Sequence, residues 1–260
     1  MKKKLLLLLT LFLVIFLVGC NSDFESYEKN YNLDNTITGE TVEYEELLKN
    51  LDALIKNFKK IENGSVIYTS EHIMNTGVSK WSANLKFNFS SDNYKKIKFY
   101  MEIKSKASYE LIFIKNGYIY VFFDILGEVE QYKLNIESYL EDWTLDEFEK
   151  TFLDRSMELF NKPNYFDSLK YRHFYLAIKQ LSSDTPTHSM SLVKDSKSNL
   201  VLDFISTKEF LIKERTVFND EYKIVYLESI NQTHTEKLFV DYGKPKFSFP
   251  STKDYTEKDN

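Results

Sequence analysis

The spacing of apolar residues changes several times along the chain, and each change predicts a different element. From Glu43 to Ile61 apolar residues recur every three or four positions, which predicts one amphipathic helix. Thr41 stands before this run as a capping hydroxyl, and acidic residues fill the expected first turn. Asn63-Gly64 is expected to end the helix.

The period then falls to two, which predicts antiparallel strands with one dry face and one wet face. Apolar and polar side chains alternate in residues 81–90 and 97–104, and residues 66–74 are expected to form a strand before them. The next segment, SYELIFIKNGYIYVFFD, contains Asn116-Gly117, a strong signal for a two-residue hairpin turn. Both arms of this hairpin are apolar on both faces, so we expect other elements to cover both faces.

Helical spacing returns in residues 136–181. Thr144 is expected to cap a helix in this insert, and Lys162-Pro163 to interrupt it. Short polar turns then separate further strands, a pattern that predicts an antiparallel meander. These strands are expected at residues 189–193, 200–206, 209–218, 222–230 and 233–242.

The order of helix, strands, helical insert and strands predicts an α+β fold. Aromatic residues on the dry faces favour a strongly curved antiparallel sheet, an incomplete β-barrel, with the N-terminal helix and the helical insert covering its concave face. We expect a single domain over residues 42–250, because no linker divides it and no internal repeat occurs. Residues 20–41 and 251–260 lack periodicity, which predicts a flexible tether and a disordered tail.

The first twenty residues predict where the protein resides. Three lysines precede an almost unbroken apolar run from Leu5 to Val18, and Gly19-Cys20 follows. This order predicts a cleaved signal peptide, residues 1–19, because a membrane-spanning helix needs roughly 20 apolar residues. Cys20 is the only cysteine, so no disulfide is expected.

Leu17-Val18-Gly19-Cys20 resembles the lipobox of bacterial lipoproteins. This resemblance implies that the Cys20 sulfur carries diacylglycerol and that cleavage makes Cys20 the first residue of the mature chain. Two acyl chains hold a protein stably on a bilayer, whereas one chain holds it only marginally. The resemblance therefore implies a protein anchored in the cell membrane on its extracytoplasmic face. The alternative is an ordinary signal peptide followed by an unmodified cysteine.

Charge and sequence motifs narrow the possible functions. Without residues 1–19 the chain has 31 basic and 39 acidic residues, a net charge of −8, which argues against nucleic acid as a partner. The chain contains no G-x-S-x-G, no P-loop and no G-x-G-x-x-G. We therefore expect no enzyme, no cofactor and no metal site, since no H-E-x-x-H spacing joins the four histidines, His72, His173, His188 and His234.

The early helix, the paired strands around Trp81 and Phe99, the hairpin at Asn116-Gly117 and the closing segment 242–250 together resemble the LolA-like superfamily. This superfamily includes the periplasmic lipoprotein carrier and the LppX-like mycobacterial lipoproteins. The resemblance implies an incomplete antiparallel barrel with helices filling its mouth.

Two functions remain as hypotheses. The first is binding of a lipid or an acyl chain in a half-barrel cavity, because apolar concave surfaces bind small ligands. The second is a non-catalytic module with a closed core that docks an envelope protein or senses the envelope. For the first, the candidate lining residues are Trp81, Leu85, Phe87, Phe99, Met101, Phe113, Tyr118 and Tyr120, unless they are ordinary core. For the second, the insert offers Trp143, Tyr165, Phe166 and Tyr171, with the same alternative.

Overall fold

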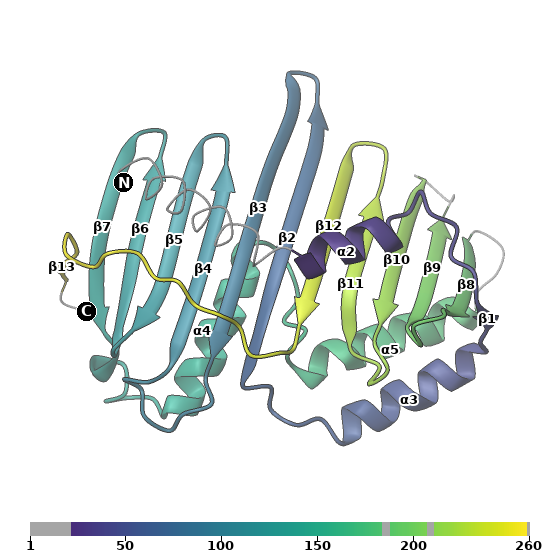
Figure 1. The fold of residues 1–260 in the computed structure, drawn as a ribbon, viewed down its shortest axis with the longest axis horizontal. Coiled ribbons are helices and arrows are strands. Elements are labelled where there is room, and N and C mark those ends of the chain that lie inside the picture. The colour runs from purple at the N-terminus through teal and green to yellow at the C-terminus, as the bar shows by residue number, and fades with distance from the viewer. Residues whose placement is uncertain (1–21, 184–187, 207–210, 259–260) are drawn as a thin grey trace, which may run out of the picture.

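The structure is a computed structural model that describes residues 22–183, 188–206 and 211–258 (Figure 1). Within these residues the chain forms one sheet of 13 strands, in the order β1-β8-β9-β10-β11-β12-β2-β3-β4-β5-β6-β7-β13. The two outer strands are not neighbours in this order, so the curved sheet is open and does not close into a barrel. The predicted α+β fold with a curved antiparallel sheet is confirmed.

The strands and helices have the following bounds. The strands are β1 (Glu40–Thr41), β2 (Asn63–Met74), β3 (Gly77–Asn88), β4 (Lys98–Ser105), β5 (Ser108–Lys115), β6 (Tyr118–Ile125), β7 (Glu128–Asn135), β8 (His188–Lys194), β9 (Leu200–Ser206), β10 (Ile212–Phe218), β11 (Ile224–Ile230), β12 (His234–Asp241) and β13 (Thr256–Glu257). The helices are α2 (Ser22–Tyr31), α3 (Tyr44–Lys56), α4 (Leu145–Leu159) and α5 (Ser168–Ser183), with a short 3-10 helix η1 (Ile136–Ser138).

The local signals placed most of these elements. The meander is present as β8 to β12, and the Asn116-Gly117 turn joins β5 to β6 with both residues at positive φ, 55° and 82°. Thr144 caps α4 in a capping box: the Glu147 amide donates to the Thr144 hydroxyl at 3.3 Å, and the Thr144 amide donates to the Glu147 carboxylate at 2.8 Å.

Helix α3 is shorter than its apolar spacing predicts. It ends at Lys56, with Asn57 as its C-cap, and Asn63-Gly64 begins β2 instead of ending the helix. Gly64 is required there by a close approach, because a Cβ at this position would lie 2.5 Å from the ring of Phe166. The ring of Phe166 packs edge-on against Phe87 on the neighbouring strand.

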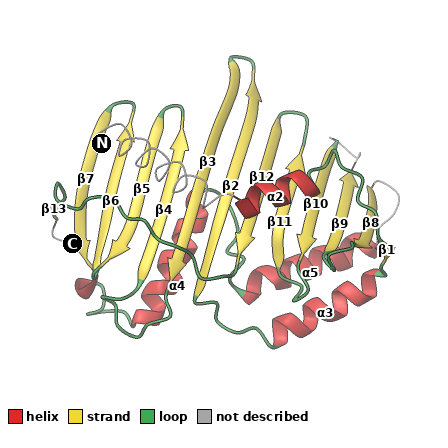
Figure 2. Cartoon of the chain, viewed as in Figure 1, coloured by secondary structure: helices red, strands yellow, loops and turns green. Residues whose placement is uncertain are grey.

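The two faces of the sheet are covered by different parts of the chain. Helices α4 and α5 lie on the concave face, whereas α2 crosses the convex face (Figure 2). The main core lies on the concave side, where α3 packs against α5 and apolar side chains of α4 meet β3, β4 and β6. On the convex side, the segment after β12 crosses β2 to β7 and ends at β13 (Figure 1).

The segment predicted as a flexible tether contains a helix that is docked on the sheet, which corrects that prediction. Tyr31 at the end of α2 is buried, and Tyr27 packs against Phe239 of β12 with ring centroids 5.2 Å apart. The guanidinium of Arg215 donates to the backbone oxygens of Asn32 and Asn35 at 2.7 and 3.0 Å. Partners for these contacts come from distant strands, so the local sequence does not reveal the docking.

The C-terminal tail was expected to be disordered, and residues 251–258 are also packed on the sheet, which is a second correction. Thr256 and Glu257 pair in parallel with β7. Tyr255 packs edge-on against Tyr120, with ring centroids 5.2 Å apart, and Phe249 packs on Phe113. The hairpin that is apolar on both faces is thus covered by the insert on one side and by this segment on the other.

Candidate ligand-binding site

An apolar groove lies between helix α4 and the β5–β6 hairpin, and we call it the α4 groove. Its volume is about 300 Å³, at the lower end of the range for small-molecule sites. It is lined by Ile112, Ile119, Tyr139, Trp143, Phe148, Thr151, Phe152, Arg155, Ser156 and Leu159.

The sequence of α4 places the helix side of this groove. Phe148, Phe152 and Leu159 recur at helical spacing, so they share one side of the helix. The ring of Phe152 packs edge-on against Phe99 at 4.8 Å between centroids, which fixes the helix over β4. Ile119 faces the helix from β6, and α4 and the strands together therefore shape the groove.

One cation borders the α4 groove. Arg155 is exposed and forms no ion pair with any residue that the structure describes. Burial raises the pKa of Tyr139, and the nearby positive charge of Arg155 opposes part of that shift. The hydroxyl of Ser156 is already used, because it donates to the Phe152 carbonyl at 2.7 Å. An apolar ligand with an anionic group would therefore meet Arg155 as its charged partner.

A second hollow adjoins the groove at the end of α4. It has a volume of about 250 Å³, and Ser79, Trp81, Ile103, Ser105, Ser108 and Glu110 line it. Leu159 lines both hollows and is 57% exposed. The two hollows therefore meet the same side chain at the C-terminal end of α4.

The eight residues predicted to line a cavity lie in three settings. Leu85, Phe87, Phe99 and Met101 are fully buried in the main core. Phe113, Tyr118 and Tyr120 lie on the convex face under the C-terminal segment. Only Trp81 borders a hollow, the one that adjoins the α4 groove. The eight residues therefore do not line one cavity.

Three of the four predicted docking residues are buried. Tyr165, Phe166 and Tyr171 are 9% exposed or less, and the hydroxyl of Tyr171 donates to or accepts from Tyr242 at 2.6 Å. Trp143 is half-buried and lines the α4 groove. The insert therefore does not present these four rings as one surface, and Trp143 belongs to the α4 groove.

Sequence reasoning missed the residues that form most of the groove. Thr151, Arg155 and Leu159 belong to an amphipathic helix whose partner strands lie far away in the sequence. The sequence offered one signal, because two large apolar residues, Leu159 and Phe160, stand side by side at the end of α4. One of them had to be less buried than the other, but the sequence does not show which. Only the position of α4 on the sheet distinguishes them.

A polar cluster also lies on the concave face. The Glu236 carboxylate accepts from Tyr68 at 2.6 Å and from Lys162, and His234 Nε2 lies 2.8 Å from it. Ser70 Oγ lies 3.3 Å from the same His234 nitrogen. A catalytic triad uses the two imidazole nitrogens separately, one for the carboxylate and one for the hydroxyl, so this arrangement does not activate Ser70.

A further hollow of about 240 Å³ lies at the start of α4, beside Glu149. The Glu149 side chain is 3% exposed and pairs with Lys60 at 3.0 Å, while its Oε1 has no hydrogen-bond partner. Burial raises the pKa of Glu149, and Lys60 opposes this shift. In the described parts of the chain, no three His, Cys, Asp or Glu side chains are grouped to hold a metal ion.

The predicted signal peptide, residues 1–19, and Cys20 lie outside the described residues. Among the residues that are described, no helix is both long and apolar enough to cross a membrane.

Comparison with known proteins gives only distant likenesses. No family model matches the sequence, and no curated protein matches it. Among solved structures, LprF from Mycobacterium bovis aligns with 82% of this chain and 99% of its own, at 8% identity and a TM-score of 0.38. A LolA superfamily protein from Nitrosomonas europaea aligns with 77% of this chain and 92% of its own, at 7% identity and a TM-score of 0.21.

A third solved structure, the MucA/MucB complex of Pseudomonas aeruginosa, aligns with 77% of this chain and 59% of its own, at 11% identity and a TM-score of 0.31. At such identities and TM-scores, these likenesses carry no argument about what this chain binds. The class is defined by the chain itself: an α+β protein with an open, curved antiparallel sheet and an apolar groove between the sheet and a helix of its insert.

Proposed function

We propose that this protein binds a hydrophobic ligand, such as a lipid or an acyl chain, in the α4 groove. The observation that carries the proposal is the apolar lining of the groove between α4 and the β5–β6 hairpin. Transfer of apolar surface from water into such a site is favourable by roughly 25 cal/mol per Å². The adjoining hollow at Trp81 extends the path available to a long ligand.

The ligand would carry an anionic group at one end. Arg155 lies at the edge of the groove without an ion-pair partner among the described residues, and its guanidinium has the fork geometry that carboxylates and phosphates accept. An anionic amphiphile such as a fatty acid or a phospholipid fits this combination of one cation and an apolar lining.

The protein would act at the extracytoplasmic face of the cell membrane. This part of the proposal is supported by the signal-peptide pattern and by the resemblance of Leu17 to Cys20 to a lipobox. Diacylglycerol on Cys20 would hold the chain at the bilayer, with the sheet and helices that follow it as the ligand-binding domain. Mass spectrometry of the chain purified from membranes tests the modification of Cys20 separately from ligand binding.

Ligand binding can be measured with the chain's own fluorophores. Trp143 lines the groove and Trp81 the adjoining hollow, and the chain has two tryptophans. Titration with cis-parinaric acid should give saturable energy transfer from tryptophan to the bound ligand. Thr151→Phe places a ring in the groove and should weaken binding at least about tenfold, which is 1.4 kcal/mol.

Glu158→Phe is the matched control, because it adds the same ring to α4 at an exposed position that does not line the groove. It should leave binding unchanged, and thermal unfolding checks that both variants fold. Absence of saturable transfer in the unsubstituted chain would contradict the proposal, as would equal binding by the two variants.

A further inference from the structure

Exposed apolar side chains gather at one end of the strands, along the side of the sheet where the β2–β3 and β6–β7 turns lie. Six of the eleven most exposed large apolar side chains among the described residues lie on two hairpin tips. Alternate turns of an antiparallel sheet lie at the same edge, so the β2–β3 and β6–β7 tips share an edge (Figure 1). We call it the apolar edge, and its exposed residues are Ile73, Met74, Val78, Ile125, Leu126 and Val129.

The turns at the opposite edge are polar. The β5–β6 turn there is Asn116-Gly117. The β8–β9 turn contains Asp195, and the β10–β11 turn contains Asp220 and Glu221. At the apolar edge, the β4–β5 turn contains Lys106 and the β11–β12 turn is Asn231 to Thr233. In the described part of the sheet from β11 to β7, the large exposed apolar side chains at this edge are therefore confined to the β2–β3 and β6–β7 tips.

Leu126 in the β6–β7 turn is the clearest example of an apolar side chain at a tip where a polar residue would be expected. Its side chain is 83% exposed and its φ is 56°, in the left-handed region that disfavours residues with a Cβ. Asn116 occupies the equivalent turn position at the opposite edge with a φ of 55°, and asparagine tolerates that conformation. Turn geometry thus does not account for leucine at position 126, whereas an apolar environment around the tip would.

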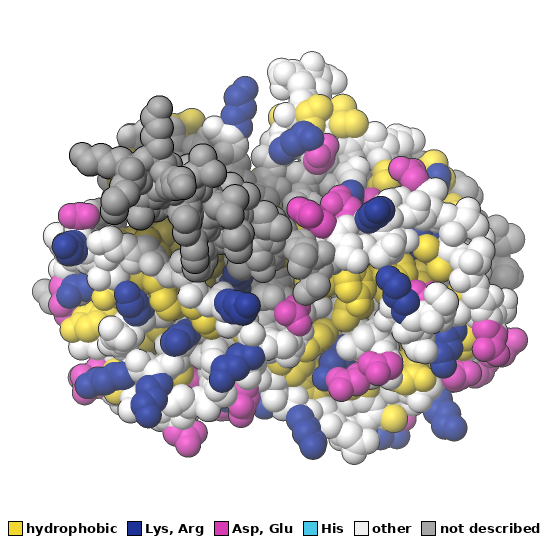
Figure 3. Space-filling view, viewed as in Figure 1, with side chains coloured by type: hydrophobic (Ala, Val, Ile, Leu, Met, Phe, Trp, Pro, Cys, Tyr) yellow, Lys and Arg dark blue, Asp and Glu magenta, His cyan; other side chains and the backbone are white. Residues whose placement is uncertain are grey.

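The β2–β3 hairpin also projects beyond the strands on either side. Strand β3 pairs with β4 only from Trp81 onward, and β2 pairs with β12 only as far as His72. Residues 77–80 therefore extend past β4 by about 13 Å. Figure 3 shows hydrophobic side chains at the end of this projecting hairpin.

We propose that the apolar edge inserts into the surface of a lipid bilayer, and this rests on the proposed function only in placing the protein at a membrane. The position of the N-terminal chain favours this occupant. The ring of Phe24 packs against Phe239, which pairs with Ile67 of β2. Cys20 lies two residues before the start of α2, and Ser22 to Phe24 are helical, so Cys20 lies at most about 10 Å from Phe24. Ile73 lies six residues beyond Ile67, about 20 Å along the strand.

These lengths set the depth of insertion. With Cys20 held at the lipid surface on the side of the apolar edge, the β2–β3 tip reaches several ångströms deeper than Cys20. Apolar faces of interfacial elements lie about 5–10 Å into the boundary between headgroups and acyl chains. The β2–β3 tip matches that depth. The register from β3 to β7 places Ile125 about level with Trp81, so the β6–β7 tip lies shallower, and neither tip spans the bilayer.

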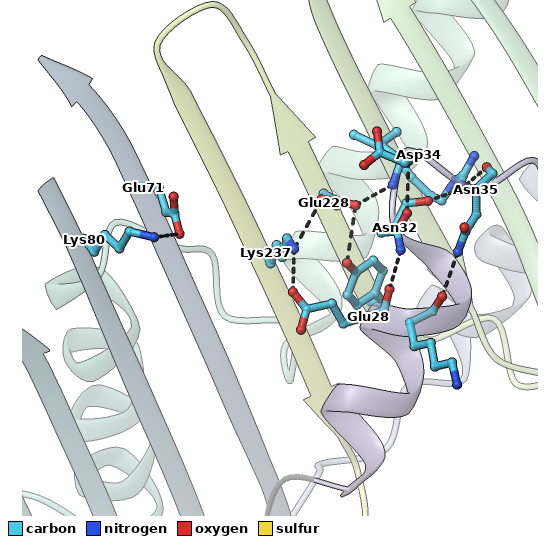
Figure 4. A network of polar contacts seen from close by, with 12 residues as sticks. Glu28, Asn32, Asp34, Asn35, Glu71, Lys80, Glu228 and Lys237 are labelled. Atoms are coloured by element: carbon cyan, nitrogen blue, oxygen red, sulfur yellow. Dashed lines mark hydrogen bonds and ion pairs between the residues drawn. The ribbon is translucent and has the colours of Figure 1, made fainter. Parts of the chain in front are cut away.

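The contact is apolar and not electrostatic. Lys80 and Lys104 near this edge pair with Glu71 and Glu102 (the first pair is drawn in Figure 4). The exposed Lys106 of the β4–β5 turn is matched in number by the exposed Glu128 of the β6–β7 hairpin, and the chain without its signal peptide has a net charge of −8. Neutral phosphatidylcholine is therefore sufficient, and added salt does not weaken the contact.

The apolar edge also lies next to the hollow that shares Leu159 with the α4 groove. The hollow at Trp81 is lined by Ser79, Ser105 and Ser108, all at the ends of strands on this edge. The hollow therefore lies between the apolar edge and Leu159, a side chain that also lines the α4 groove.

The experiment places an environment-sensitive NBD dye at the tips of the full chain. Cys20 is the only native cysteine, and Met74→Cys and Leu126→Cys each add one labelling site. Preformed phosphatidylcholine vesicles are added to the purified chain, with and without doxyl-labelled lipid. Both dyes should brighten several-fold, shift to the blue and be quenched by the doxyl group, at low and at high salt.

Leu176→Cys on α5 is the matched control, because Leu176 is also apolar and 52% exposed but lies away from this edge. Its dye should not respond, and the labelled wild type reports any dye on Cys20. Leu126→Asn should fold at least as well as the wild type, since asparagine suits this φ, and should reduce quenching at position 74.

Tip dyes that behave like the dye at position 176 on vesicle-bound protein would overturn the proposal. A dye response that appears without vesicles and rises with protein concentration would also overturn it, because a second copy of the chain would then cover the edge. Ligand binding in the α4 groove is measured separately, by energy transfer from tryptophan. The dye experiment therefore still tests membrane insertion if the groove binds no ligand.

Discussion

Glu236 is a charged residue on the concave face, and its contacts join side chains from several elements. Its carboxylate accepts from Tyr68, His234 and Lys162, and the Lys162 ammonium also lies 5.0 Å from the centre of the Tyr68 ring. Burial alone would raise the pKa of Glu236, but the hydrogen bonds outweigh burial and the pKa is lowered. Lys162 belongs to the segment between α4 and α5, so this cluster ties the insert to β2 and β12.

The lowered pKa of Glu236 gives a prediction with a defined sign. A carboxyl group whose pKa is lower when folded adds stability above its unfolded pKa, near 4.5, and this is lost as pH falls through the folded value. Glu236→Gln should lower the free energy of unfolding by about 2 kcal/mol at pH 7, since it removes a hydrogen-bonded charge beside Lys162. Urea denaturation at pH 7 and pH 3.5 should show a smaller difference at the lower pH.

Glu221→Gln is the control for that prediction. The Glu221 side chain is 63% exposed and pairs with Lys223 at the surface, so its loss should change the free energy of unfolding by less than about 1 kcal/mol. Equal losses in the two variants at pH 7, or a Glu236→Gln effect that grows as pH falls, would contradict the assigned role of Glu236.

At the scale of the element, helix α2 depends on a polar network on the convex face. Arg215, 3% exposed, forms two hydrogen bonds with the Asp203 carboxylate, at 2.6 and 2.7 Å, and donates to two carbonyls after α2. Glu228 accepts from the Leu33 amide at 2.7 Å, and Lys237 pairs with Glu28 (Figure 4). The network joins the first described helix to β9, β10, β11 and β12.

Arg215→Gln should release α2 and lower overall stability. Arg215 is buried, but the Asp203 side chain that loses its partner is 28% exposed, so the loss should be about 2–3 kcal/mol. Urea denaturation should show this loss, and limited proteolysis should cleave residues 22–41 faster in the variant. The exposed pair Lys80–Glu71 offers the control, because Lys80→Gln should cost less than about 1 kcal/mol and leave cleavage unchanged.

At the scale of the whole molecule, an open sheet has two outermost strands. Here both of them, β1 and β13, are very short. Strand β1 pairs with β8 through two residues, and β13 pairs with β7 through two residues. Exposed strand edges are templates for pairing with other chains, and short edge strands limit that risk. The segment that ends in β13 also covers Phe113 and Tyr120 on the convex face.

Truncation after Pro250 should therefore promote association as well as lower stability. It removes the β7 edge partner and the ring of Tyr255, and light scattering should show concentration-dependent oligomers. Tyr255→Ala keeps β13 and should lower the free energy of unfolding by about 1–2 kcal/mol, less than a fully buried ring would. Oligomers in Tyr255→Ala, or none after truncation, would show that the edge strand is not the protecting feature.

The sequence alone determined the elements whose signals are local. Period-two alternation placed β3 and β4, Asn116-Gly117 placed the β5–β6 hairpin, and Thr144 placed the start of α4. These signals depend on side chains within a few residues of each other, so no knowledge of the remaining chain was needed. The sequence did not predict strand β7, because EVEQYKLN has little apolar alternation and the strand is held by its pairing with β6.

Only the tertiary structure decided which face each apolar side chain occupies and where the groove lies. Phe113 and Ile114 look alike in the sequence, but the register places Phe113 under the C-terminal segment and Ile114 in the core beneath the insert. The polar segments 22–41 and 251–258 are ordered by contacts with distant strands. Such contacts form only after the sheet has assembled, and a pattern of neighbouring residues contains no record of them.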